Sequence, residues 1–148
     1  MSLKWDIRFL KLAHEISQWS KDPSTKVGAI AVGPNREIRS QGYNGFPRGV
    51  TDSEERYNDR QLKYRLTVHA EANMCLHAAR TGTILEGCMA YVTFPPCSSC
   101  AGSLIQAGIS EIVTPVVSIP DRWIEELTIA DMILKEANIP IRKIEVTL

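Results

Sequence analysis

Two short stretches carry side chains that can bind a metal and move protons. In "TVHAEANMC", His69 and Glu71 lie two positions apart, so on an ideal helix they do not share a face. In "PPCSSC", Cys97 and Cys100 lie three apart at the expected start of a helix, so both thiolates can face one point. Free backbone amides at a helix start favour negative charge there. These residue types point to metal-assisted chemistry.

One zinc site can use all of these groups. Two thiolates do not close a tetrahedral site, and His69 is the obvious third ligand. Three protein ligands with one open position are typical of a catalytic zinc, whose bound water has a pKa lowered towards ~7. We expect Glu71 to point into the same cavity and carry protons without touching the metal. Because structural zinc and redox motifs share C-x-x-C, a structural zinc or an accidental pairing is the alternative.

The remaining cysteines and histidines have no partners at ligand spacing. Cys75 follows Glu71 by one helical turn and Cys88 begins an apolar stretch, so both are expected to be small core residues. His14 and His77 are expected on helices, in solvent or at the core edge. The sequence therefore predicts one zinc per chain.

Length and charge limit the classes of function. A chain of 148 residues, 44% of them hydrophobic, suits a single domain over 1–148. Its 17 basic and 17 acidic side chains argue against nucleic acid as partner, although one or two cations can hold a small phosphorylated ligand. No apolar run suits a membrane span or a signal peptide. We expect a soluble, cytoplasmic protein whose cysteines are thiols or ligands.

Hydrophobic periodicity predicts the elements that position these residues. Helices are expected over 4–20, 67–80, 98–108 and 121–137, and strands over 26–32, 38–43, 88–94, 111–117 and 141–148. The polar, charged residues 46–66 suggest a surface loop or a short irregular helix. The alternation of helix and strand after the hairpin predicts a mixed, largely parallel sheet with helices on both faces.

Five stretches resemble the cytidine deaminase superfamily and, within it, the deoxycytidylate (dCMP) deaminases: "SKDPSTKVGAIAV", "GYNGFPRG", "HAEAN", "YVTFPPCSSCA" and "LIQAGI". His-x-Glu followed by Pro-Cys-x-x-Cys matches the known signature of zinc nucleobase deaminases, and the GYNG-x-P-x-G run separates this branch from its relatives. The resemblance implies an α/β fold, a three-layer α-β-α sandwich with a central mixed five-stranded sheet. It also implies hydrolysis of dCMP to dUMP and ammonia, which supplies thymidylate synthesis.

The resemblance assigns a role to each matching residue. His69, Cys97 and Cys100 would hold the zinc. Glu71 would protonate N3 of the pyrimidine and then hand a proton to the leaving amine. Asn44 would bind the sugar hydroxyl.

The contacts to the base and the phosphate complete the expected substrate site. The backbone around Ala70 and Pro95 would read the base edge. Arg122 should lie at the carboxyl edge of the sheet, where ligands of such folds bind, and its guanidinium could bind a phosphate. The alternative is that the Arg122 side chain is exposed to solvent. Lys26, at the start of the first strand, is another possible phosphate donor, and Ser24, just before that strand, is a further substrate-binding candidate.

Regulation and assembly follow from the resemblance alone. Many members are activated by dCTP and inhibited by dTTP near the loop that here contains Gly45, Phe46 and Arg48. The same loop could be a simple turn, and Arg48 could instead contact phosphate. Some members hold a second, structural zinc in an insertion, but residues 46–66 contain neither Cys nor His. Hexamers in the family imply a homo-oligomer.

Other interpretations remain for single side chains and for the substrate. Trp5, Trp19 and Trp123 are assigned to the core, with Trp123 beside Arg122 the one that could serve the site. The run "DSEERYNDRQLKYR" is typical of a solvated face, and alternatively some of its cations cover the pocket mouth. Alternative substrates are dCTP, a modified dCMP, free cytosine or guanine, and tRNA adenosine. A zinc-stabilised binding module without activity would have no use for Glu71.

Overall fold

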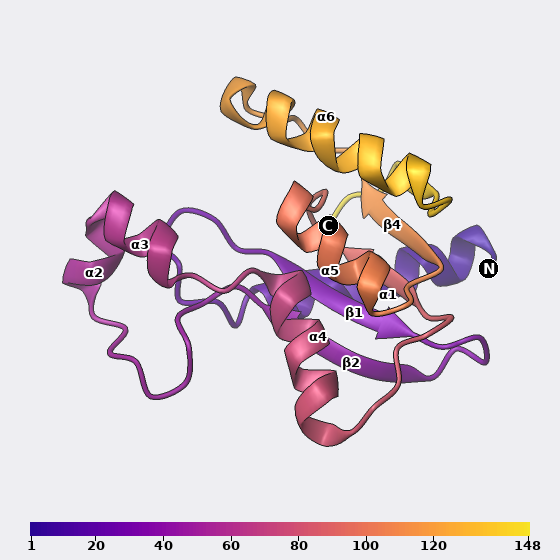
Figure 1. Cartoon of the computed structure of the whole chain (residues 1–148), viewed down its shortest axis with the longest axis horizontal. Coiled ribbons are helices and arrows are strands. Elements are labelled where there is room, and N and C mark those ends of the chain that lie inside the picture. The colour runs from indigo at the N-terminus through magenta and orange to yellow at the C-terminus, as the bar shows by residue number, and fades with distance from the viewer.

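The computed structural model describes residues 1–148, which form three layers with a five-stranded sheet as the middle layer (Figure 1). The strands are β1 (Gly28–Val32), β2 (Ile38–Tyr43), β3 (Met89–Val92), β4 (Glu111–Pro115) and β5 (Ile141–Ile144), in the spatial order β2-β1-β3-β4-β5. The mixed sheet is confirmed, but it is less parallel than expected. Because β1 lies between two antiparallel neighbours, β2 and β3, only the β3–β4 and β4–β5 pairs are parallel.

Helices cover both faces of this sheet. The helices of the chain are α1 (Leu3–Ser17), α2 (Glu54–Asn58), α3 (Arg60–Leu66), α4 (Ala70–Thr81), α5 (Ser98–Gln106) and α6 (Asp121–Glu136), of which α1 covers one face and α4, α5 and α6 cover the other. Strand side chains alternate between two cores, as the pleat requires. Ile30 packs with Phe9 and Leu10 of α1, whereas Ala29 and Ala31 pack in the core under α4, α5 and α6.

The start of α4 lies unusually close to the sheet because β2 carries a glycine there. A Cβ on Gly42 would lie 2.3 Å from the Ala70 carbonyl oxygen and 2.4 Å from the Met74 nitrogen. Ser40 lies two residues before Gly42 on the same face of β2, and its hydroxyl donates a hydrogen bond of 2.7 Å to the Met74 carbonyl. The backbone around His69 is thereby held against a rigid strand.

Three regions differ from the sequence-based expectations. Residues 46–66 contain two short helices, α2 and α3, capped by the side chains of Ser53 and Asp59, and both lie apart from the layered body in Figure 1. Trp19 was wrongly assigned to the core. Helix α1 ends before it, and the ring is 56% exposed. Strand β4 ends at Pro115, so the apolar pair that follows is exposed.

None of the helices combines the length and the apolar composition that a membrane span requires. None of the four cysteines forms a disulfide bond in the structure.

Candidate active site

The three predicted metal ligands meet where two helices begin. His69 is the N-cap residue of α4, Cys97 is the N-cap residue of α5, and Cys100 lies in the first turn of α5. Their ligand atoms all lie within 4.8 Å of one another. The His69 Nδ1 atom is 3.5 Å from the Cys97 sulfur and 3.4 Å from the Cys100 sulfur.

These distances fit a tetrahedral zinc ion. Zinc bonds of about 2.3 Å to sulfur and about 2.0 Å to nitrogen separate adjacent ligand atoms by roughly 3.5 Å. The donor set of two thiolates and one imidazole also suits zinc chemically. No oxygen of a fourth protein ligand joins the group. The site therefore fits one zinc with an open coordination position.

The charges at the cluster favour a cation. Hydrogen bonds from the Cys100 thiol and from His69 lower the pKa of Cys97 to about 4, although burial opposes this. The bonded Cys97 sulfur, together with burial, raises the pKa of Cys100. The hydrogen bond between His69 and Cys97 also raises the pKa of His69. Like charge on two close sulfurs is unfavourable, so a divalent cation is the partner that allows both to ionise.

Glu71 lies beside this cluster, in the first turn of α4, and is 4% exposed. Burial raises the pKa of its carboxyl group, while the helix backbone and His69 oppose the rise. It forms no salt bridge, which is unusual for a carboxyl group buried this deeply. A buried carboxyl with a raised pKa next to a metal site suits a group that accepts and releases a proton.

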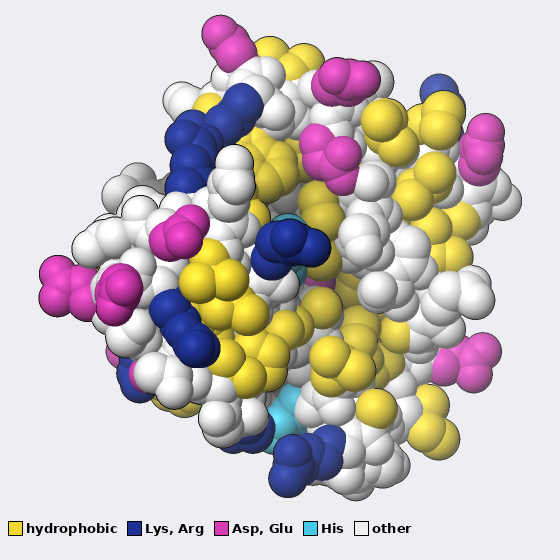
Figure 2. Space-filling model, turned by 60° about the vertical axis from the view of Figure 1, so that its left-hand side comes forward, with side chains coloured by type: hydrophobic (Ala, Val, Ile, Leu, Met, Phe, Trp, Pro, Cys, Tyr) yellow, Lys and Arg dark blue, Asp and Glu magenta, His cyan; other side chains and the backbone are white.

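The cluster lies in a cavity of about 590 Å³. Figure 2 shows this hollow, with histidine visible inside, hydrophobic side chains around it and a basic side chain at its mouth. Its walls come from the loop before β1, the end of β2, helix α3, the loop after β3 and the start of α6. His69, Glu71 and Cys97 belong to the part of the lining that comes from the starts of α4 and α5, whereas Cys100 is buried behind it.

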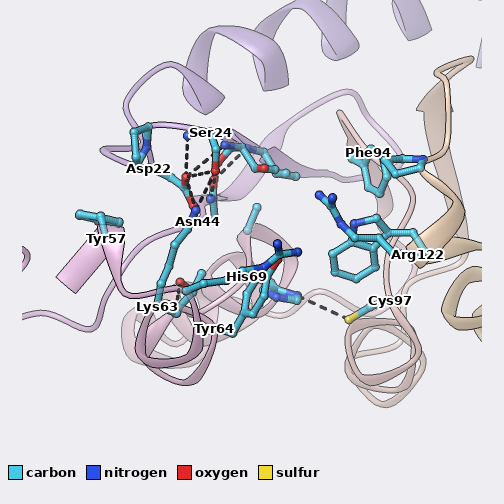
Figure 3. A pocket seen from close by; sticks show the side chains of 18 of the residues that line it. Asp22, Ser24, Asn44, Tyr57, Lys63, Tyr64, His69, Phe94, Cys97 and Arg122 are labelled. Atoms are coloured by element: carbon cyan, nitrogen blue, oxygen red, sulfur yellow. Dashed lines mark hydrogen bonds and ion pairs between the residues drawn. The ribbon is translucent and has the colours of Figure 1, made fainter. Parts of the chain in front are cut away.

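Most of the predicted substrate-binding residues line this cavity. They are Ser24, Asn44, Ala70, Pro95 and Arg122, several of which are labelled in Figure 3. Lys26 is exposed and does not line it, and neither do Gly45, Phe46 or Arg48.

The Asn44 side chain holds the loop before β1. Its Oδ1 atom accepts from the Val27 amide at 2.8 Å, and its Nδ2 atom donates to the Thr25 carbonyl at 2.8 Å. The second N–H of the amide forms no hydrogen bond within the chain. Asn44 therefore shapes the cavity wall in addition to lining it.

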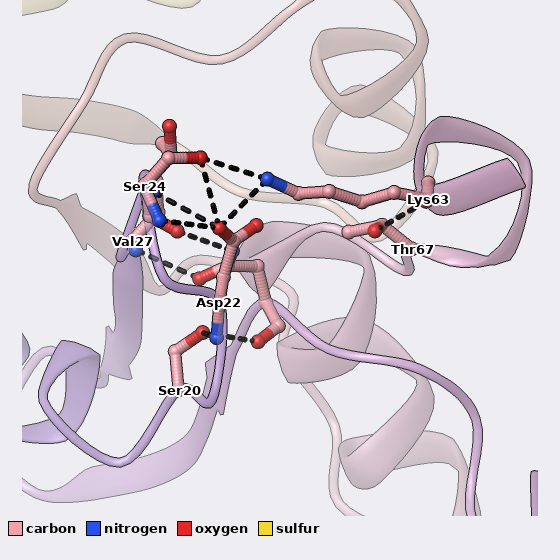
Figure 4. Close-up of polar contacts among 8 residues, drawn as sticks. Ser20, Asp22, Ser24, Val27, Lys63 and Thr67 are labelled. Carbon is pink, nitrogen blue, oxygen red and sulfur yellow. Dashed lines mark hydrogen bonds and ion pairs between the residues drawn. The ribbon is translucent and has the colours of Figure 1, made fainter. Parts of the chain in front are cut away.

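Helix α3 is fastened to the same loop by an ion pair that the sequence did not reveal (Figure 4). Lys63 Nζ lies 2.8 Å from Asp22 Oδ1 and donates to the Ser24 hydroxyl oxygen at 2.8 Å. Asp22 Oδ1 also accepts from the amides of Ser24 and Thr25, at 2.9 and 3.1 Å. Asp22 is 3% exposed and Lys63 is 9% exposed, so the pair is largely removed from water.

Two arginines occupy the mouth of the cavity without an acidic partner. Arg122, at the start of α6, and Arg60, at the start of α3, both line the cavity, and neither forms a salt bridge. Arg60 packs over the Tyr64 ring at 5.4 Å. The aromatic rings of Tyr64, Phe94 and Trp123 add flat apolar walls. The only sequence signal for Arg60 was the charged run over residues 52–65, whose alternative interpretation placed its cations over the pocket.

The fold and the site together define a zinc-binding α/β protein with a buried carboxyl group beside the metal ligands. Residues 3–116 match the model of the cytidine and deoxycytidylate deaminase zinc-binding region. The chain is 36% identical to deoxycytidylate deaminase of Mus musculus over 95% of its own length and 80% of that protein. It is 41% identical to an uncharacterised deaminase of Aliivibrio fischeri, over 95% and 94% of the two chains. The chain therefore belongs to the zinc-dependent cytidine and deoxycytidylate deaminase family.

Solved structures support the fold assignment. The dCMP deaminase of cyanophage S-TIM5, solved in complex with dCMP and dUMP, superposes with a TM-score of 0.80 at 24% identity. The match covers 97% of this chain and 99% of the cyanophage chain. At this identity the likeness establishes the three-layer α-β-α architecture that was predicted from the resemblance.

Proposed function

We propose that this chain hydrolyses dCMP to dUMP and ammonia with one zinc ion as cofactor. The observation that carries the proposal is the buried Glu71 beside the His69, Cys97 and Cys100 cluster, inside a cavity with unpaired arginines at its mouth. The names of the mouse and cyanophage relatives support the choice of dCMP among cytosine compounds.

The side chains inside the cavity perform the proton transfers. Zinc, when bound, supplies a coordinated water whose pKa is lowered towards ~7. Glu71 would take one proton from the attacking water and deliver it to N3 of the pyrimidine as the water oxygen bonds to C4. It would then move the remaining proton of that oxygen to the amine, which leaves C4 as ammonia. Its burial and its raised pKa suit a group that must hold a proton between these two transfers. The start of α4, where the first amides have no partner within the helix, can stabilise the charge that develops.

Backbone groups beside the cluster can read the base and the sugar. Ala70 is the first residue of α4, so its N–H has no partner within the helix and can donate to the ring carbonyl. The Pro95 carbonyl can accept from the exocyclic amine. Asn44 retains one N–H for the sugar hydroxyl.

The arginines at the mouth are suited to the phosphate. A guanidinium offers two parallel N–H groups to phosphate oxygens, and neither Arg60 nor Arg122 is already committed to a carboxylate. We assign to Arg60 the phosphate contact that the sequence analysis had offered to Lys26 or Arg48. Arg60 lines the cavity, whereas Lys26 and Arg48 lie outside it. Ser24 supports the site indirectly, since its hydroxyl already accepts from Lys63.

Regulation, assembly and location stay predictions. Phe46 stacks on Tyr57 with ring centroids 4.3 Å apart, and Tyr57 lines the cavity. This contact could transmit the binding of dCTP or dTTP at the loop of Gly45 and Arg48 to the substrate site.

Four further proposals come from the family alone. They are a homo-oligomer of up to a hexamer, a cytoplasmic location, a single domain over 1–148 and a role in thymidylate supply.

A panel of cytosine compounds tests the proposal. Deamination changes the ultraviolet spectrum of a pyrimidine, so absorbance follows dCMP, dCTP, deoxycytidine, cytidine and cytosine in parallel. The zinc-loaded protein should deaminate dCMP with a kcat/KM at least ~10-fold above that of deoxycytidine, the loss expected when one charge-assisted phosphate contact is missing. Equal rates on both, or turnover of cytosine alone, would overturn the assignment.

A further inference from the structure

A carboxylate from α6 caps the helix that carries two of the zinc ligands. Glu126 Oε1 accepts a hydrogen bond of 2.8 Å from the Ser98 amide and one of 2.5 Å from the Ser98 hydroxyl. Ser98 is the first residue of α5 and directly follows Cys97. The amide of a first helical residue cannot be satisfied inside its own helix. Glu126 therefore satisfies a backbone group immediately beside a metal ligand.

The contact matters because another amide of this turn bonds to a ligand atom. The Cys97 sulfur accepts from the Cys100 amide at 3.4 Å, and the Cys97 carbonyl accepts from the Ala101 amide at 2.8 Å. The turn thus has two anionic acceptors, a sulfur from within and a carboxylate from α6. Without the Glu126 carboxylate, the Ser98 N–H loses its hydrogen-bond acceptor, and the turn loses the contact that fixes its orientation.

Helix α6 reaches the cavity from the same end. Arg122 and Glu126 lie four residues apart, so they occupy the same side of α6 one turn from each other. Arg122 and its neighbour Trp123 line the mouth, while Glu126 contacts the turn of Cys97. The first two turns of α6 therefore join the substrate end of the cavity to the metal end.

We propose that Glu126 is a positioning residue for the metal centre. By holding the Ser98 amide and hydroxyl, it sets the orientation of the first α5 turn and thereby the placement of the Cys97 and Cys100 sulfurs. The inference rests on the zinc site and is independent of which cytosine compound is deaminated, so the two proposals can fail separately.

The test measures how firmly and in what geometry the metal is held. Zinc-loaded parent, Glu126→Ala and Glu126→Gln are mixed with a chromogenic chelator, and the rate of zinc release is followed. Outer-shell partners of metal ligands typically change metal affinity by 10–100-fold when removed, so Glu126→Ala should release zinc at least ~10-fold faster. Both hydrogen bonds end on one oxygen, which a glutamine amide can supply. Glu126→Gln should therefore stay within about threefold of the parent by the same scale.

Cobalt substitution adds a readout that a purely structural role would not move. The visible absorption bands of bound Co²⁺ report its ligand geometry, and they should shift in Glu126→Ala but keep their parent form in Glu126→Gln. Glu125→Ala is the matched control, because Glu125 is an exposed neighbour without a hydrogen bond to α5. It should match the parent in both measurements.

The outcomes decide the proposal in each case. Parent-like zinc release and an unchanged cobalt spectrum in Glu126→Ala would overturn it, as would a Glu125→Ala effect of equal size. If Glu126→Ala does not fold, Glu126→Asp carries the test, since it keeps the charge but withdraws the oxygen from Ser98 by one methylene. Fast zinc release from a folded Glu126→Asp supports the positioning role, and slow release contradicts it.

Discussion

The inner end of the cavity and its mouth are built on different principles. At the inner end, two short motifs at helix starts supply His69, Glu71, Cys97 and Cys100, and the ligand atoms of His69, Cys97 and Cys100 lie within 4.8 Å of one another. At the mouth, Arg60 and Arg122 come from separate helices more than sixty positions apart in the chain. Under the proposed function, the residues of the reaction can be recognised from local spacing, whereas the residues proposed to select the substrate are brought together only by the packing of distant segments.

The largest expected effect concerns the inner end. A Cys97→Ser, Cys100→Ser double variant should lose its zinc and all detectable dCMP turnover, because hydroxyl groups do not replace thiolate ligands. Metal analysis of protein purified without added zinc should give one zinc per parent chain. Cys75→Ser, on α4 but outside the cluster, is the control and should keep its zinc. Full retention in the double variant, or two zinc ions per parent chain, would refute the site.

Glu71→Gln should separate proton transfer from metal binding. The amide has the same shape but cannot carry the proton, so turnover should fall at least ~100-fold, within the usual range for removing a general acid–base group. Initial rates and zinc content are measured on the same preparation, with Glu125→Gln as a surface control. A loss of zinc would make Glu71 a ligand, and unchanged turnover would leave the reaction without its proton carrier.

At the mouth, Lys63→Met should loosen α3. It leaves Asp22, which is 3% exposed, without its cation, while the apolar stem keeps its volume. We expect the free energy of unfolding in urea to fall by about 2 kcal/mol, between the values for exposed and fully buried pairs.

The control for Lys63→Met is an exposed pair of the same type. Lys21 and Asp52 have side chains that are 70% and 42% exposed, so Lys21→Met should leave the unfolding transition where it is. Equal changes in both variants would mean that the Asp22–Lys63 pair does not fasten α3.

Arg122→Ala should act on one substrate only. If its guanidinium holds the phosphate, kcat/KM for dCMP should fall ~10-fold while that for deoxycytidine hardly changes. Arg65→Ala, exposed on α3 and outside the cavity lining, should leave both values unchanged. Equal losses on both substrates would indicate a folding defect, and no loss on either would remove Arg122 from the phosphate site.

The smallest expected effect is a pH dependence. Burial raises the pKa of Asp22, but the hydrogen bond from Lys63 and the Ser24 and Thr25 amides outweigh it and lower that pKa below its usual value. The carboxylate therefore stabilises the fold above the unfolded pKa of about 3.9, and this stabilisation is lost as the pH falls through the lower folded pKa. Unfolding in urea between about pH 6 and 3 should show a shallower acid loss in Lys63→Met than in the parent. Parallel curves would contradict this.

The sequence predicts the residues at the inner end of the cavity better than those at its mouth. The strand over residues 38–43 and the helix near 121–136 follow from periodicity because each buries one face. The metal ligands and Glu71 were found because a fixed motif spacing demands them. Arg60, Lys63 and Glu126 were missed as site residues because nothing local distinguishes them from surface charges. Lys26, chosen for its nearness to a motif, lies outside the cavity because the loop before β1 turns it into solvent.

The most direct measurement of the central claim is equilibrium binding of dCMP and deoxycytidine to zinc-loaded Glu71→Gln. If the inner end performs the reaction and the mouth selects the nucleotide, this variant keeps its zinc and binds dCMP at least ~10-fold more tightly than deoxycytidine, although it scarcely turns either over. Equal affinity for the two ligands would contradict the division of labour between the inner end and the mouth.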